Sequence, residues 1–224
     1  MRKTIPFFLF LIIFSSCIEI LDDIKFNFDG SGTFRYTVNL SSSQVKLNSI
    51  LALDSLDGKK VPSLPEIQEK IESFGMKLSE EEGISNVHID TNYTQFIFKI
   101  QCDFSNVSNL QRGIENAIQS ITTDLINENL SYDWITYDSR VMIRTVPNFE
   151  SWSLPKIKTE DSELLKKGNY TSITRFENLV NAFENTDAKL SKNKHAVMLR
   201  KSAFDVFNDH TAMDNIIYVD STKY

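Results

Sequence analysis

The sequence predicts an α+β domain in which an antiparallel sheet is packed on one face by two to three helices. Three observations support this prediction. Several segments alternate apolar and polar residues, as half-buried strands do. Two segments open with a capping box and continue with helical spacing of apolar residues. Strands and helices also follow one another in blocks, without the strict alternation of a parallel α/β fold.

The first predicted element is a β-hairpin near the amino terminus. Ile24, Phe26 and Phe28 alternate with polar residues, and the alternation resumes from Phe34 to Leu40. The segment Gly30-Ser31-Gly32 lies between these two stretches, and its glycines can adopt the positive φ angles of a turn. One face of the hairpin is therefore expected to be apolar and the other to be polar and solvent-exposed.

Two helices are predicted next. Ser41 to Ser43 can cap a helix that ends near Leu53. The second helix begins at Ser63-Leu64-Pro65-Glu66, which combines a capping box with a proline in the first turn. Its apolar residues follow the spacing of a single buried stripe, and Gly75 is predicted to end it.

Another pair of strands and a third helix follow. A short strand is expected from Val87 to Ile89, and a longer one from Phe96 to Phe104. Cys102 falls on the apolar side of the longer strand, so its thiol is expected in the core. Ser108 to Gln111 form a second capping box, and the helix that they open has an apolar side reaching Ile121.

The carboxyl-terminal part has less regular patterns. Pro147 to Leu165 is expected to be irregular or weakly helical. Strands are expected near Tyr132–Tyr137, Arg140–Val146, Tyr170–Arg175, His195–Arg200 and Ile216–Val219, with a short helix near Phe204.

The amino terminus has the layout of a signal peptide. Met1-Arg2-Lys3 is a short positive region, and Ile5 to Phe14 is a mostly apolar stretch. This stretch is too short to span a bilayer, which needs roughly 20 residues. Two small residues then precede Cys17.

Phe14-Ser15-Ser16-Cys17 resembles the lipobox of bacterial lipoproteins, in which a leucine and two small residues precede the cysteine. Phe14 stands where leucine is usual. The resemblance implies that the Cys17 sulfur receives a diacylglyceryl group, that the preceding peptide is removed, and that the new amine is acylated with a fatty acid such as palmitate. The alternatives are an ordinary secretory signal with a chance cysteine and an uncleaved anchor.

This interpretation divides the chain into three parts. Residues 1–16 are a lipoprotein signal peptide, residues 17–23 a short lipidated tether with solvated acids, and residues 24–224 a single α+β domain with less regular patterns after residue 147. Loss of Arg2 and Lys3 with the signal peptide changes the formal net charge from −6 to −8. This acidity argues against a nucleic-acid or anionic-lipid partner reached through general electrostatics, and we predict no nucleic-acid partner.

Few residues are candidates for catalysis or metal binding. His88 lies on the polar side of a predicted strand, and His195 lies at a turn. His210 has three aspartates nearby in sequence, where a metal site is the alternative to an ordinary polar loop. The sequence contains no G-x-S-x-G motif and no glycine-rich phosphate loop. We therefore predict a protein that is not an enzyme and has no catalytic residue, no cofactor and no metal, with Cys17 as the one modification site.

The order of features resembles the LppM-type domain of bacterial lipoproteins. The resemblance lies in Phe28 to Gly32 soon after the lipid cysteine, a helical middle, and then Phe96 to Phe98 and Asp103-Phe104 leading to Leu110. It covers roughly Ile18 to Val146. It implies an α+β envelope domain with lipid or glycolipid binding and without catalytic residues. The frequent use of Asn and Phe also suits a Bacteroidetes source.

Three functions are considered. The first is a membrane-anchored, non-enzymatic envelope lipoprotein that binds an apolar ligand or an envelope protein at the membrane surface. The expected location is the outer membrane, on its periplasmic or outer face. The second is a structural or assembly factor, and an envelope hydrolase ranks last. A closed apolar cavity above about 300 Å³ would favour binding of an apolar ligand. An exposed apolar patch would favour binding of a protein partner. Converging His and Asp side chains would favour a hydrolase. The 16 phenylalanines fit either a filled core or a hollow one.

Overall fold

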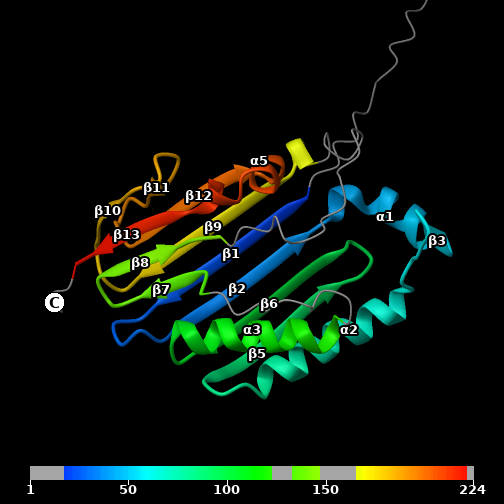
Figure 1. Ribbon diagram of the computed structural model, residues 1–224, viewed down its shortest axis with the longest axis horizontal. Coiled ribbons are helices and arrows are strands. Elements are labelled where there is room, and N and C mark those ends of the chain that lie inside the picture. The colour runs from blue at the N-terminus through cyan, green and yellow to red at the C-terminus, as the bar shows by residue number, and fades with distance from the viewer. Residues whose placement is uncertain (1–17, 123–132, 147–164, 221–224) are drawn as a thin grey trace, which may run out of the picture.

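The computed structural model describes residues 18–122, 133–146 and 165–220. Its main element is a seven-stranded sheet with the strand order β11-β12-β9-β1-β2-β6-β5 (Figure 1). The strands of this large sheet are β1 (Glu19–Phe26), β2 (Gly32–Asn39), β5 (Ile84–Asn92), β6 (Ile97–Phe104), β9 (Asn169–Phe176), β11 (Lys189–Leu190) and β12 (Ala196–Ser202).

A second, four-stranded sheet has the order β10-β13-β8-β7. Its strands are β7 (Ile135–Tyr137), β8 (Val141–Arg144), β10 (Val180–Phe183) and β13 (Asn215–Val219). The helices are α1 (Gln44–Leu51), α2 (Leu64–Ser79), α3 (Val107–Ile121) and α5 (Ala203–Asn208), with 3-10 turns at Ser41–Ser43 and His210–Met213 and a two-stranded ribbon of β3 (Ser55–Leu56) and β4 (Lys59–Lys60). None of the helices in the described residues is long and apolar enough to cross a membrane.

The predicted α+β class is confirmed, with one change in the pairing of strands. All neighbouring strands of the large sheet are antiparallel except β1 and β9, which run parallel from Glu19 opposite Asn169 to Phe26 opposite Phe176. The sheet is therefore mixed, because the chain returns to β1 through a crossover instead of a hairpin. The covering layer also differs from the prediction: α2 and α3 pack over the β5–β6 side, and the small sheet packs over the β9–β12 side.

The first strand begins earlier than expected. We predicted a start at Ile24, but β1 begins at Glu19, one residue after the first described residue. Pairing with β2 on one side and β9 on the other holds Glu19 to Asp23 in the sheet. Residues 19–23 therefore belong to the folded domain, and the predicted solvated tether is wrong for them. The turn that follows is as predicted, with Gly30 at a φ of 84° and the Asp29 carboxylate accepting from the Ser31 backbone N–H.

The helix α2 begins as predicted and ends later. The Ser63 hydroxyl accepts from the Glu66 N–H, and the Glu66 carboxylate accepts from the Ser63 N–H, which completes the capping box. Gly75 does not end the helix, which continues to Ser79. A Cβ atom at Gly75 would lie 2.2 Å from Cδ1 of Ile89, so this glycine lets α2 pack closely on β5.

Other boundaries differ by a few residues. Asn106, and not Ser108, caps α3 by accepting from the Asn109 N–H. The later strands and the helix near Phe204 are present at the expected positions, and β10 and β11 are additional. The segment predicted to be irregular, 147–165, lies outside the described residues except for Leu165.

The core is rich in aromatic side chains. Phe26 is buried at its centre and contacts Phe104, Tyr137 and Phe176 at ring-centroid distances of 5.9, 4.3 and 5.7 Å. Cys102 is fully buried among these residues, as predicted. Burial raises the pKa of its thiol to about 12, with a smaller contribution from Asp103, so the thiolate needed for nucleophilic chemistry does not form at neutral pH.

Candidate functional site

The most unusual feature of the interior is an ion pair between the two sheets. Arg144, at the end of β8, reaches from the small sheet to Asp22 on β1. The two guanidinium nitrogens donate to the two carboxylate oxygens at 3.1 and 2.9 Å, and both side chains are at most 5% exposed. Such a pair is costly to bury unless further hydrogen bonds complete it.

Two neighbouring side chains on β9 provide those hydrogen bonds. The Tyr170 hydroxyl donates to Asp22 at 2.7 Å, and the Ser172 hydroxyl donates at 2.8 Å. The carboxylate thus accepts four hydrogen bonds, which is close to its full capacity. Arg144 also lies over the Trp134 ring at 5.5 Å. Burial, and then the nearby Asp22 charge, raise the pKa of Tyr170 well above its ordinary value, so this hydroxyl stays protonated and donates.

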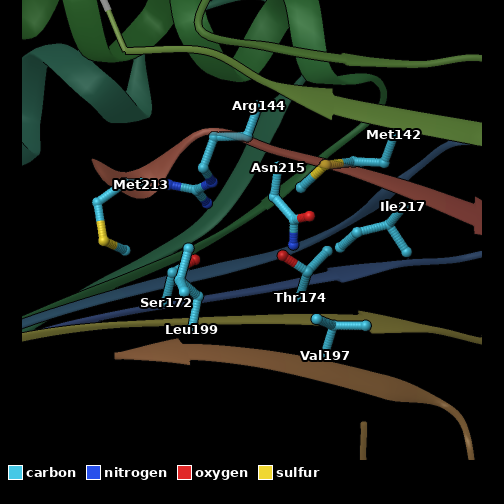
Figure 2. Close-up of a pocket in the computed structure, with 9 residues that line it drawn as sticks. All are labelled: Met142, Arg144, Ser172, Thr174, Val197, Leu199, Met213, Asn215 and Ile217. Carbon is cyan, nitrogen blue, oxygen red and sulfur yellow. The ribbon is translucent and has the colours of Figure 1, made fainter. Parts of the chain in front are cut away.

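A small cavity adjoins this cluster, between the two sheets. Figure 2 shows Met142, Arg144, Asn215 and Ile217 entering it from the small sheet. The large sheet supplies Ser172, Thr174, Val197 and Leu199, and Met213 completes the lining. The volume is about 10 Å³, which is space for about one water molecule. A fatty acyl chain needs far more room, so this cavity is not the apolar ligand site that we considered.

A larger hollow lies on the surface beside α2 and the end of α3. It has a volume of about 410 Å³ and is open to solvent. Its lining is Lys60, Pro62, Glu66, Glu69, Lys70, Ser73, Ser120 and Ile121. Lys60 and Glu66 pair with each other at 2.6 Å, so two of these charges are satisfied within the protein. The hollow is open and half of its lining residues are charged, unlike the enclosed, mostly apolar pockets that bind small molecules.

The histidines considered from the sequence lie apart. His88 is exposed on β5, opposite Gln101 of β6. His195 is half-buried, with Nδ1 at 3.1 Å from the Phe176 carbonyl oxygen. His210 begins the 3-10 turn that follows α5, and its side chain lies outside the described part of the structure. Within residues 18–122, 133–146 and 165–220, no group of three or more His, Cys, Asp or Glu side chains is placed to bind a metal ion.

Two of the aspartates near His210 in sequence have clear structural partners. The Asp209 carboxylate accepts from the Thr211 N–H at 2.9 Å and caps the 3-10 turn. The Asp214 carboxylate accepts from the Val146 N–H at 2.8 Å and so ties β8 to the start of β13. These carboxylates therefore stabilise the backbone.

The opposite face of the large sheet is polar and exposed. Asp23 lies on it, next to the buried Asp22 but pointing the other way, and forms a two-bond pair with Arg175 at 2.8 and 3.0 Å. Arg35 donates to Gln101 at 2.8 Å on the same face. These pairs join neighbouring strands side by side.

Sequence reasoning missed Asp22 and Arg144. The signal for Asp22 was its phase, because it lies two residues before Ile24 and four before Phe26, on the apolar side of the strand. Arg144 likewise lies two residues after the buried Met142. Cys17, the predicted lipidation site, lies just outside the described residues, with Ile18 and then β1 following it.

Comparison with known proteins gave little. No family model matches the chain, and no curated protein matches it. Among solved structures, the folded domain of the LppM protein of Mycobacterium tuberculosis is similar, with 12% sequence identity and a TM-score of 0.39 over 98% of this chain and 97% of that one. These values are too low to transfer a function.

Proposed function

We propose that this chain is a non-enzymatic envelope lipoprotein, anchored through lipid on Cys17, that holds a protein partner at the membrane surface. The observation that carries the proposal is the sequence from Met1 to Cys17, where a positive start, an apolar stretch and two small residues precede a cysteine. Two acyl chains or more hold a protein stably on a bilayer, because each buried methylene contributes about 0.8 kcal/mol.

The start of β1 brings the domain close to this anchor. Only Ile18 separates Cys17 from Glu19, the first residue of β1. Since each residue spans at most about 3.6 Å, the Cα atoms of Cys17 and Glu19 lie within roughly 7 Å of each other. A tether of residues 17–23 would have allowed about three times that distance. The folded domain would therefore lie directly on the membrane surface.

The interior favours binding at the outer surface of the domain over two alternatives, an enclosed ligand and a catalysed reaction. The Asp22 carboxylate is saturated by four hydrogen bonds and buried, so it is not available to a substrate. The cavity beside it has space for about one water. The second candidate is an assembly factor, which would hold an envelope complex together without another activity. This role would also use the outer surface of the domain.

The experiment that tests the anchor uses the two cysteines of the chain. Cells that produce the protein are labelled with radioactive palmitate and then fractionated. The Cys17→Ala variant is expected to carry no label and to leave the membrane fraction, while the matched Cys102→Ala variant keeps both. Unchanged labelling and fractionation of Cys17→Ala would refute the proposal.

A further inference from the structure

The amino-terminal end of β1 is one point in a row that crosses the large sheet. Strand register aligns Glu19 with Asn39 of β2 on one side and with Asn169 of β9 on the other. Asn169 is in turn opposite Ser202, the last residue of β12. Strands are about 4.8 Å apart, so the ends of β2 and β12 lie about 5 and 10 Å from the start of β1. Whatever follows β2 and β12 therefore lies beside the anchor.

One of these neighbours is α5, which follows β12 directly. The Ala203 N–H donates to the Gly168 carbonyl at 2.9 Å, and the Asn169 N–H donates to the Ile18 carbonyl at 2.7 Å. A Cβ atom at Gly168 would lie within 3.4 Å of both Ile18 and Ala203. The first residue of α5 is thus packed next to the residue that follows Cys17. Phe207, one turn further along α5, is 42% exposed.

The other neighbour is α1, which follows β2 through the 3-10 turn at Ser41–Ser43. Half of its eight residues are apolar, and of these Leu47, Ile50 and Leu51 are half-buried while Val45 is exposed. Val45 is 73% exposed, and the chain after α1 exposes Leu53 and Leu56 as well. Figure 1 shows α1 and α5 at the same end of the large sheet as the start of β1.

We propose that this anchor end, made of α1, the following residues to Leu56, and α5, lies against the lipid bilayer and places Val45, Leu53, Leu56 and Phe207 among the lipid head groups and upper acyl chains. This inference rests on the lipid anchor at Cys17. The domain would stand on the membrane with its strands pointing away from the surface, and with the Asn27–Gly30 turn at the far end.

The bilayer fits this surface better than a protein would. The anchor would already hold the start of β1 within roughly 7 Å of the lipidated residue, so exposed apolar side chains at this end would meet lipid before any other partner. Single apolar side chains that project from a protein surface can enter the lipid interface, and long basic side chains beside them can reach the head groups. Lys167 is exposed among these elements and can take that role, while the neighbouring Lys166 lies over the Phe204 ring at 5.3 Å.

Spin labels can test the orientation in the lipidated protein. Because the lipid occupies Cys17 and Cys102 is buried, a cysteine introduced on the surface is the accessible thiol for a nitroxide. Variants Val45→Cys and Phe207→Cys are labelled after reconstitution into phosphatidylethanolamine–phosphatidylglycerol vesicles. Phe28→Cys, in the turn at the far end of β1, is the control for Phe207→Cys, since Phe28 is 38% exposed and Phe207 42%.

Collision of each nitroxide with oxygen, which concentrates in lipid, and with a water-soluble nickel complex reports its depth. The oxygen-to-nickel ratio at positions 45 and 207 is expected to be several-fold higher than at position 28. Equal ratios at all three positions on protein that floats with the vesicles would overturn the orientation and leave the anchor intact. Protein that does not float would overturn the anchor, and the orientation with it.

Discussion

Asp22 and Asp23 are neighbours on one strand, and each forms a two-bond pair with an arginine. Asp22 points to the covered face and pairs with Arg144 of the other sheet, where both side chains are at most 5% exposed. Asp23 points to the open face and pairs with Arg175 of the adjacent strand, where the arginine is 44% exposed and the aspartate 13%. The local geometry of the two pairs is nearly the same, but the first pair is buried between two sheets and the second lies partly exposed on one sheet.

The comparison shows that geometry alone does not determine what an ion pair contributes. The Asp23–Arg175 pair keeps much of its solvation through the exposed guanidinium, so its net contribution to stability is about 0 to 1 kcal/mol. The buried pair has lost its solvation, and its worth depends on whether every hydrogen bond is made. Tyr170 and Ser172 make those bonds for Asp22, so removal of any member leaves a charge or a polar group without its partner.

The largest expected effect follows removal of the Asp22 charge. Asp22→Asn leaves the Arg144 guanidinium buried without a counter-ion, and we expect the free energy of unfolding to fall by about 3–5 kcal/mol. Urea titration of the purified protein measures this change. Arg144→Met should cost a similar amount, and the double variant should cost less than the sum of the two. Additive losses would show that the two groups do not depend on each other.

An alkaline titration should give the next largest effect. Burial, with a smaller contribution from Asp22, raises the pKa of Tyr36 to about 12, against about 10 in an unfolded chain. Above pH 10 the unfolded state loses this proton first, so the free energy of unfolding should fall between pH 10 and 12, by up to about 3 kcal/mol from this group. Tyr36→Phe should lose less over the same range, and equal losses in the two proteins would contradict the assignment.

Tyr170→Phe removes one hydrogen bond to the buried carboxylate and keeps the ring. We expect a loss of about 1.5–3 kcal/mol, because hydrogen bonds to charged groups are among the stronger ones in proteins. Chemical denaturation at pH 7 measures it. A loss as small as that of a surface substitution would mean that the carboxylate does not need its fourth donor.

The smallest effect is expected on the open face. Asp23→Asn should change the free energy of unfolding by less than about 1 kcal/mol, and the difference from wild type should shrink in high salt because exposed charges are screened. Urea titrations of both proteins at low and high salt measure the loss of unfolding free energy and its dependence on salt. A loss comparable to that of Asp22→Asn would remove the distinction between the two faces.

The sequence predicted the local elements well where the physical cause is local. Alternation in β2 and β6, the capping box of α2 and the Gly30 turn each depend on residues a few positions apart. Gly75 was misread because the atom that explains it, Cδ1 of Ile89, belongs to another element. The same limit hid β10 and β11, whose few residues form strands only through pairing with β13 and β12.

The buried cluster could not be read from the sequence for a similar reason. Asp22 continues the apolar phase of β1, yet a carboxylate is rarely buried without a partner. Its partner Arg144 lies 122 residues away, and Tyr170 and Ser172 lie 148 and 150 residues away. The parallel pairing of β1 with β9 brings Tyr170 and Ser172 beside Asp22, and packing of the small sheet on the large one brings Arg144. No local pattern specifies either contact.

The central place of β1 has a consequence for the time course of folding. During synthesis β1 finds its parallel neighbour only after the residues of β9 have been made, and the buried Asp22 carboxylate has no counter-ion until β8 is in place. Contacts so distant along the chain slow folding, typically to milliseconds or seconds. A partly made chain would expose β1 as an unpaired edge, which is a site for aggregation. Stopped-flow refolding of the purified protein measures that rate. Delayed folding, until the carboxyl-terminal strands are available to pair with β1, would avoid this exposed edge.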